Sequence, residues 1–138
     1  MSATVTAEGR SITGDRGALL NRSLRLDALM SGVSGLVAAA GATALDGVLG
    51  VSTAFLVALG VFLLAYSAGL LALARAGAPT PGVWAVIVGN ALWVVASVVT
   101  VLADWLTLTT AGTVVALGQA AAVALTAETQ LVGLRRRR

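Results

Sequence analysis

Two carboxylates within otherwise apolar sequence are the residues of this chain most able to do chemistry. Asp27 and Glu128 could act as a general acid and base if the fold brought them together. No set of residues that would supply a nucleophile with its base accompanies them. Cysteine and histidine are absent, which excludes thiolate nucleophiles, Cys/His zinc sites and histidine ligation of haem. We therefore expect no enzyme, with no catalytic residue, no metal and no cofactor.

Amide, hydroxyl and aromatic side chains accompany the carboxylates in the same half of the expected bilayer. Intramembrane polar groups tend to face the interior of a helix bundle and to bind one another. We expect a shared network around Asp27, Asn90 and Glu128. The full set of candidate polar-network or ligand-binding residues is Asp27, Tyr66, Ser67, Asn90, Trp93, Gln119, Glu128 and Gln130.

A simpler interpretation of the two carboxylates remains open. Asp27 is two residues from Arg25, and Glu128 is two turns from Arg135, so each could pair with an arginine at headgroup level. Glu128 also lies about 180° around its helix from Gln119, at 100° per residue. The two side chains cannot face the same neighbour, so one of them would serve an oligomer interface.

Four long apolar stretches must position these residues. The chain has 138 residues, of which 58% are hydrophobic, and its mean hydropathy is +0.95, far above that of soluble domains. Each stretch is long enough to cross a bilayer as a helix, and the short links make neighbouring helices antiparallel. We predict an all-α polytopic membrane protein, a four-transmembrane-helix up-down-up-down bundle. Residues 21–138 form the domain, with helices at about 24–45, 51–74, 83–103 and 108–134, and residues 1–20 form a disordered cytoplasmic tail.

The charge distribution predicts the orientation. All nine basic residues are arginines, and they lie in the N-terminal segment, at Arg75 and in the C-terminal tail. The two opposite connections hold only Asp46 and Asp104. Because cytoplasmic segments carry the arginine excess, both termini should be cytoplasmic. We read the arginines as contacts to membrane lipids rather than to nucleic acid, and the arginine-rich, lysine-free composition suggests a bacterial plasma membrane.

Small or polar residues recur at every seventh position of each apolar stretch. One example is Gly112, Gln119, Thr126 and Gly133; another is Asp27, Ser34 and Gly41. This spacing keeps the residues on one face and suits helix packing near +20°. We interpret these faces mainly as contact seams, with a path for a solute as the less favoured alternative.

Several short segments together carry a resemblance. They are Leu24-Arg25-Leu26-Asp27-Ala28, Ser31-Gly32-x-x-Gly35-Leu36, Asn90-x-x-Trp93, Gln119-Ala120, and Ala127-Glu128-x-Gln130 followed by Gly133-Leu134-Arg135-Arg136. With these, the chain resembles a widespread bacterial family of small four-helix integral membrane proteins without an assigned activity. The resemblance covers nearly everything after residue 23. It implies one intact four-helix unit and no particular reaction.

Two functions are consistent with this pattern. The first is a small interaction or accessory protein that self-associates or supports another membrane protein, because small-residue seams lie on several faces. The second is a binder or carrier of a small apolar or lipid-like molecule, held by the polar residues of the cytoplasmic half. A void-free core with an intersubunit face would favour the first function. A ligand-sized space beside Asn90 and Trp93 would favour the second.

Overall fold

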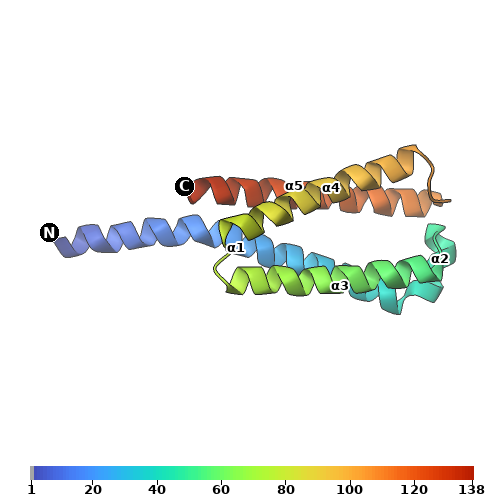
Figure 1. Ribbon diagram of the computed structural model, residues 1–138, viewed down its shortest axis with the longest axis horizontal. Helices are drawn as coiled ribbons and strands as arrows, with labels where there is room; N and C mark the ends of the chain where they lie inside the picture. The colour runs from blue at the N-terminus through green and yellow to red at the C-terminus, as the bar shows by residue number, and fades with distance from the viewer. Residues whose placement is uncertain (1) are drawn as a thin grey trace.

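The computed structural model describes residues 2–138, with side chains from Gly17 onward, and helices are the regular secondary structure of this part. The long helices lie roughly along one direction, and the short helix lies across their end (Figure 1). The helices are α1 (Ser2–Ala40), α2 (Ala42–Leu49), α3 (Thr53–Arg75), α4 (Thr80–Leu102) and α5 (Thr110–Arg136).

Helices α3, α4 and α5 are each long and apolar enough to cross a membrane. Gly17–Ala40 of α1 and α2 together pass the same test as a bent pair, which raises the number of candidate spans in the described residues from three to four. A run of about 20 apolar residues matches the thickness of a bilayer's hydrocarbon core. The protein is therefore an all-helical membrane protein.

The first predicted helix, about 24–45, is wrong at its outer end. The chain bends by 93° between α1 and α2, and Gly41 lies at the bend. A Cβ on Gly41 would lie 2.8 Å from the Val37 carbonyl oxygen, so a larger residue does not fit. Apart from Thr43, residues 36–45 are apolar, and hydropathy therefore gives no sign of the bend.

The start of α1 also differs from the expected disordered tail at residues 1–20. Met1 lies outside the described residues, but α1 begins at Ser2. Leu20 is almost completely buried and packs against Gly133 of α5, where a Cβ would lie 3.1 Å from the Leu20 backbone. The packed part of the protein therefore begins before Asn21.

The helices associate as two pairs. Helix α1 packs along α3, α4 packs along α5, and α1 also contacts α5, whereas α3 and α4 meet at few positions. Gly35 and Gly60 let α1 and α3 approach closely, because a Cβ on Gly60 would lie 2.6 Å from the Gly35 carbonyl oxygen and from the Ala39 nitrogen. Small residues at such contacts are typical of membrane helices.

The two ends of the bundle are built differently. The buried apolar core gathers at the end that holds the termini and the α3–α4 connection: Leu20, Leu24, Ala28, Leu70, Ala74, Ala78, Val83, Ile87 and Leu134. At the other end, carbonyl oxygens at the end of α2 accept hydrogen bonds from the α4–α5 connection. The Thr109 nitrogen donates to the Leu49 carbonyl oxygen (3.1 Å), and Thr107 Oγ1 donates to that of Gly50 (3.3 Å).

We expect Gly60→Ala to destabilise the protein by about 1–3 kcal/mol, because the added methyl overpacks the α1–α3 contact. Gly69→Ala, on the same helix, is the matched control, since nothing lies within 4 Å of a Cβ at that position. It should leave stability unchanged or raise it slightly. Thermal unfolding of the purified proteins in one detergent measures both. Equal stability of the two variants would contradict the close approach at Gly60.

Candidate functional site

Side chains from all four long helices meet in one hydrogen-bonded group, the four-helix cluster: Asp27 (α1), Tyr66 (α3), Asn90 (α4) and Gln130 (α5). Asp27 Oδ2 accepts from Asn90 Nδ2 (2.9 Å) and from Gln130 Nε2 (2.8 Å). Asn90 Nδ2 also donates to Gln130 Oε1 (3.2 Å), and the Tyr66 hydroxyl donates to Asn90 Oδ1 (2.8 Å). The structure thus brings together four of the eight candidate residues.

The four-helix cluster is buried, and it connects the four long helices. Asp27 and Asn90 are each 4% exposed and Gln130 is 0% exposed. The second oxygen of Asp27, Oδ1, accepts from the Ser31 hydroxyl (3.3 Å). Among the described residues, every buried side-chain nitrogen and oxygen has a hydrogen-bond partner. Since unpaired polar groups are costly in an apolar surrounding, this complete pairing explains how the cluster is tolerated.

Glu128 was wrongly expected in this network. It is exposed on α5, and Gln130 takes the place next to Asp27 and Asn90. Two residues along a helix are about 200° around its axis, so Glu128 points away when Gln130 points inward. Asp27 and Glu128 consequently do not form an acid pair. Arg25 binds Asn21 Oδ1 through Nε (2.7 Å), while Asp27 points into the cluster.

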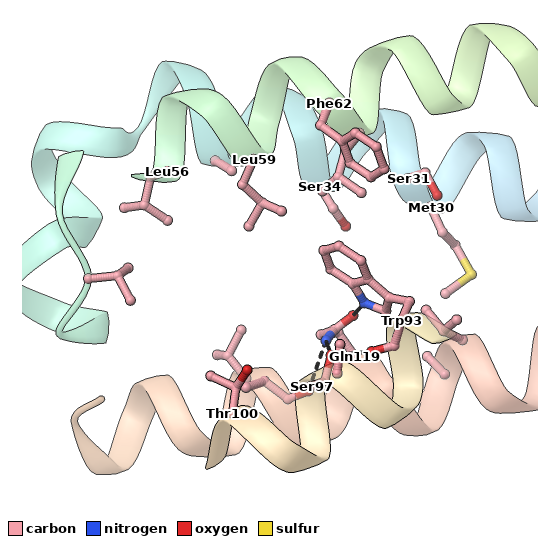
Figure 2. A pocket seen from close by; sticks show the side chains of 18 of the residues that line it. Met30, Ser31, Ser34, Leu56, Leu59, Phe62, Trp93, Ser97, Thr100 and Gln119 are labelled. Atoms are coloured by element: carbon pink, nitrogen blue, oxygen red, sulfur yellow. Dashed lines mark hydrogen bonds between the residues drawn. The ribbon is translucent and has the colours of Figure 1, made fainter. Parts of the chain in front are cut away.

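Trp93 and Gln119 form a second group together with Ser97, the indole–amide cluster. Trp93 Nε1 donates to Gln119 Oε1 (2.7 Å), and Gln119 Nε2 donates to Ser97 Oγ (3.1 Å). The Ser97 hydroxyl donates in turn to the Trp93 carbonyl oxygen (2.8 Å). Figure 2 shows this chain of hydrogen bonds on the wall of a pocket. It joins α4 to α5 at positions one to two turns from Asn90 along α4 and about three turns from Gln130 along α5.

Ser67, the remaining candidate, lies apart from both clusters. Its hydroxyl donates to the Ala28 carbonyl oxygen (2.6 Å), and a Cβ on Gly32 would lie 2.9 Å from Ser67 Oγ. Ser67 therefore joins α1 to α3 as part of their contact seam.

A cavity of about 650 Å³ lies between the α1–α3 pair and the α4–α5 pair. Its lining extends from Asp27 and Asn90 to Leu49 and Gly112 near the other end of the bundle. Its wall is mostly apolar, and all five helices contribute to it. The two polar clusters lie along one part of this wall, so the cavity is polar in that region and apolar along the rest of its length.

Aromatic rings bridge the side on which α3 and α4 diverge. The Phe62 ring is nearly parallel to that of Trp93, with ring centroids 6.2 Å apart and an angle of 9°. Phe62 also stacks on Tyr66, at 6.3 Å and 11°. Phe62 is 54% exposed and lines the cavity. It therefore stands between the cavity and the outside of the bundle.

Sequence reasoning missed several hydroxyl groups of this cavity. Ser31, Ser34, Ser97 and Thr100 all line it, and Figure 2 shows Ser34 and Thr100 on facing walls. The sequence pattern indicates Ser34 only as a seam position, and Ser97 lies seven residues from Asn90 in the same way. Their seven-residue spacing from Asp27 and Asn90 was the available signal, because residues at that spacing share a helix face.

Within the described residues, no group of three or more Asp, Glu, Cys or His side chains lies close enough together to hold a metal ion. No family model, curated protein or solved structure matches the chain. The resemblance to small four-helix membrane proteins therefore stays a prediction.

We expect Asp27→Leu to destabilise the protein by about 1–3 kcal/mol, because two buried amides lose their shared acceptor. Asp27→Asn keeps an oxygen that both amides can reach and should cost less. The control is Glu128→Gln, which alters an exposed carboxylate and should leave unfolding unchanged. Thermal unfolding in detergent compares the three. An Asp27→Leu variant as stable as Glu128→Gln would show that the cluster does not hold the helices together.

Proposed function

We propose that the protein binds one small apolar or lipid-like molecule in the cavity between its two helix pairs. The observation that carries the proposal is the cavity itself, because about 650 Å³ falls within the range of small-molecule sites in proteins. Self-association, the first function expected, accords best with a closed core, and the open space gives it less support than ligand binding.

The side chains that line the cavity indicate what kind of ligand it can bind. Its apolar residues come from every helix and include Leu45, Leu59, Leu63, Val115 and Val123. The polar atoms of both clusters already bind one another, and Asp27 is surrounded by neutral donors. The fitting ligand is thus a long apolar body with at most a small neutral polar group, which the hydroxyls of Ser34 and Thr100 could bind.

A ligand of this kind would enter from the bilayer. Helices α3 and α4 diverge along one side of the cavity, and Phe62 and Trp93 stand at that side. An apolar molecule is far more concentrated in the membrane than in water, because burial of apolar surface is favourable. Entry between α3 and α4 therefore avoids any transfer through water.

The same proposal includes four membrane crossings, with α1 and α2 as one bent crossing and both termini in the cytoplasm of a bacterial cell. Its support is the arginine bias, since the termini and the α3–α4 connection with Arg75 lie at one end of the bundle. Arg137 strengthens that end by donating from Nη1 to the Ala78 carbonyl oxygen (2.6 Å) and from Nη2 to that of Gly77 (3.1 Å).

Filling the cavity should abolish binding. With a long-chain alcohol as the probe, the wild-type protein should gain about 1.4 kcal/mol of stability at ten times the dissociation constant. Ala96→Phe adds a ring to the cavity wall and should remove this gain. The matched control is Ala91→Phe, because Ala91 is exposed on the same helix and does not line the cavity.

Thermal unfolding of the three proteins in one detergent, with and without the alcohol, measures the effect. An equal gain in all three would mean that the alcohol acts on the micelle or the outer surface, and the cavity would not be its site.

Reporter fusions test the orientation separately. A fusion after residue 138 should be active only as a cytoplasmic reporter, and a fusion within residues 46–50 only as a periplasmic one, because arginine-rich segments stay in the cytoplasm. Periplasmic activity of the C-terminal fusion would overturn the topology without affecting the cavity.

A further inference from the structure

A second, shallower groove runs along the outside of α1 and α3, and it shares no lining residue with the interior cavity. Its volume is about 470 Å³, and its lining residues are Arg25, Ala28, Leu29, Gly32, Val33, Leu36, Leu64, Ser67 and Leu71. All but Arg25 and Ser67 are apolar. We propose that this groove binds an acyl chain of an anionic phospholipid, with the lipid phosphate held by Arg25.

The shape of the groove suits a flexible chain. Its floor is low because Gly32 and Ser67 bring the two helices close together, and the Ser67 hydroxyl is occupied by the Ala28 carbonyl oxygen. Its rim consists of Leu29, Val33 and other apolar side chains that are largely exposed. A saturated hydrocarbon can fill such a surface without leaving a polar group unpaired.

The length of the groove matches one leaflet. Arg25 and Leu36 are eleven residues apart on α1, which corresponds to about 16 Å at 1.5 Å per residue. Half of a hydrocarbon core of about 30 Å is about 15 Å. An acyl chain that starts beside Arg25 therefore follows the groove to about the middle of the membrane. The leaflet is the one on the side of the chain termini.

Arg25 is held in place at the headgroup end. Its Nε donates to Asn21 Oδ1 (2.7 Å), and Asn21 Nδ2 donates to the Ala74 carbonyl oxygen of α3 (3.0 Å). This arrangement uses Nε and leaves the two terminal amino groups of the guanidinium for a phosphate, which they match in geometry. Arg22, one turn away, and Arg75, next to Ala74, add positive charge at the same end.

Charge decides between possible occupants. A second copy of the chain in the same orientation would bring its own Arg22 and Arg25 to this face, and like charges would repel. A phospholipid with a net negative headgroup is attracted, and an arginine that contacts the headgroup of the bound lipid favours it by roughly fivefold. A zwitterionic lipid carries its own ammonium group and gains less.

Native mass spectrometry of the purified protein with phosphatidylglycerol or phosphatidylcholine of identical chains tests the proposal. The wild-type protein should retain phosphatidylglycerol preferentially, and Arg25→Gln should reduce the preference roughly fivefold. Arg136→Gln removes the same charge from an exposed position of α5 and should have little effect. An equal loss in both variants would show general attraction to the arginine-rich end and would overturn the proposal.

Two further variants separate the groove from the interior cavity. Val33→Trp fills the groove without changing charge and should lower retention of phosphatidylglycerol, whereas Ala96→Phe, which fills the cavity, should not. Full retention by Val33→Trp, or loss only in Ala96→Phe, would overturn the outer site while leaving the interior site standing. A lipid-free species with the mass of two chains would show that a second copy covers the groove, and would overturn the proposal as well.

Discussion

The hydrogen bonds to Asp27 are the interaction on which the rest of the structure depends. One carboxylate oxygen accepts from Asn90 and Gln130, residues 63 and 103 positions away in the sequence. Tyr66 lies on α3, the remaining long helix, and it joins the cluster by donating a hydrogen bond to Asn90. Individual hydrogen bonds within membranes are weak, about 0.6 kcal/mol on average. Removing one side chain of the cluster would also leave several buried polar groups unpaired. The cost of leaving these groups unpaired is larger than that of losing one hydrogen bond. The cluster therefore sets the lateral order and the register of the helices together.

The cavity follows from the way in which the two ends of the bundle are closed. Near the termini, bulky side chains such as Leu24 and Leu70 fill the space between the helices. At the opposite end, α2 meets the start of α5 through backbone contacts, and a Cβ on Gly112 would collide with the Leu49 carbonyl oxygen. Between these two closures the pairs α1–α3 and α4–α5 are joined by few side chains. The cavity thus lies between the two closed ends of the bundle, where the two helix pairs are furthest from either closure.

Much of this fold is predictable from sequence, and its exceptions have physical causes. The last three helices lie within three residues of their predicted bounds, because proline, glycine and aspartate interrupt the apolar runs. The bend at Gly41 was not predictable, since hydropathy does not change across it. Asn90 could be predicted as part of the network, because a polar side chain within an apolar helix tends to face the bundle interior. Gln130 was named too, but Glu128 was preferred for its charge, although helical geometry allows only one of the two to face Asp27. The cavity depends on the distance between the two helix pairs, and that distance cannot be inferred from a single sequence.

The sequence separation between Asp27 and Gln130 has a consequence for biosynthesis. The ribosome delivers α1 first and α5 last, so α1 is complete while the residues that will donate hydrogen bonds to Asp27 are still being translated. An aspartate at the centre of a helix in lipid costs about 2.5–3.5 kcal/mol on the insertion scale. Its position near the end of the apolar stretch lets it stay close to the headgroups in the meantime. Asp27 therefore has its full set of hydrogen-bond partners only after Gln130, 103 residues further along the chain, has been synthesised.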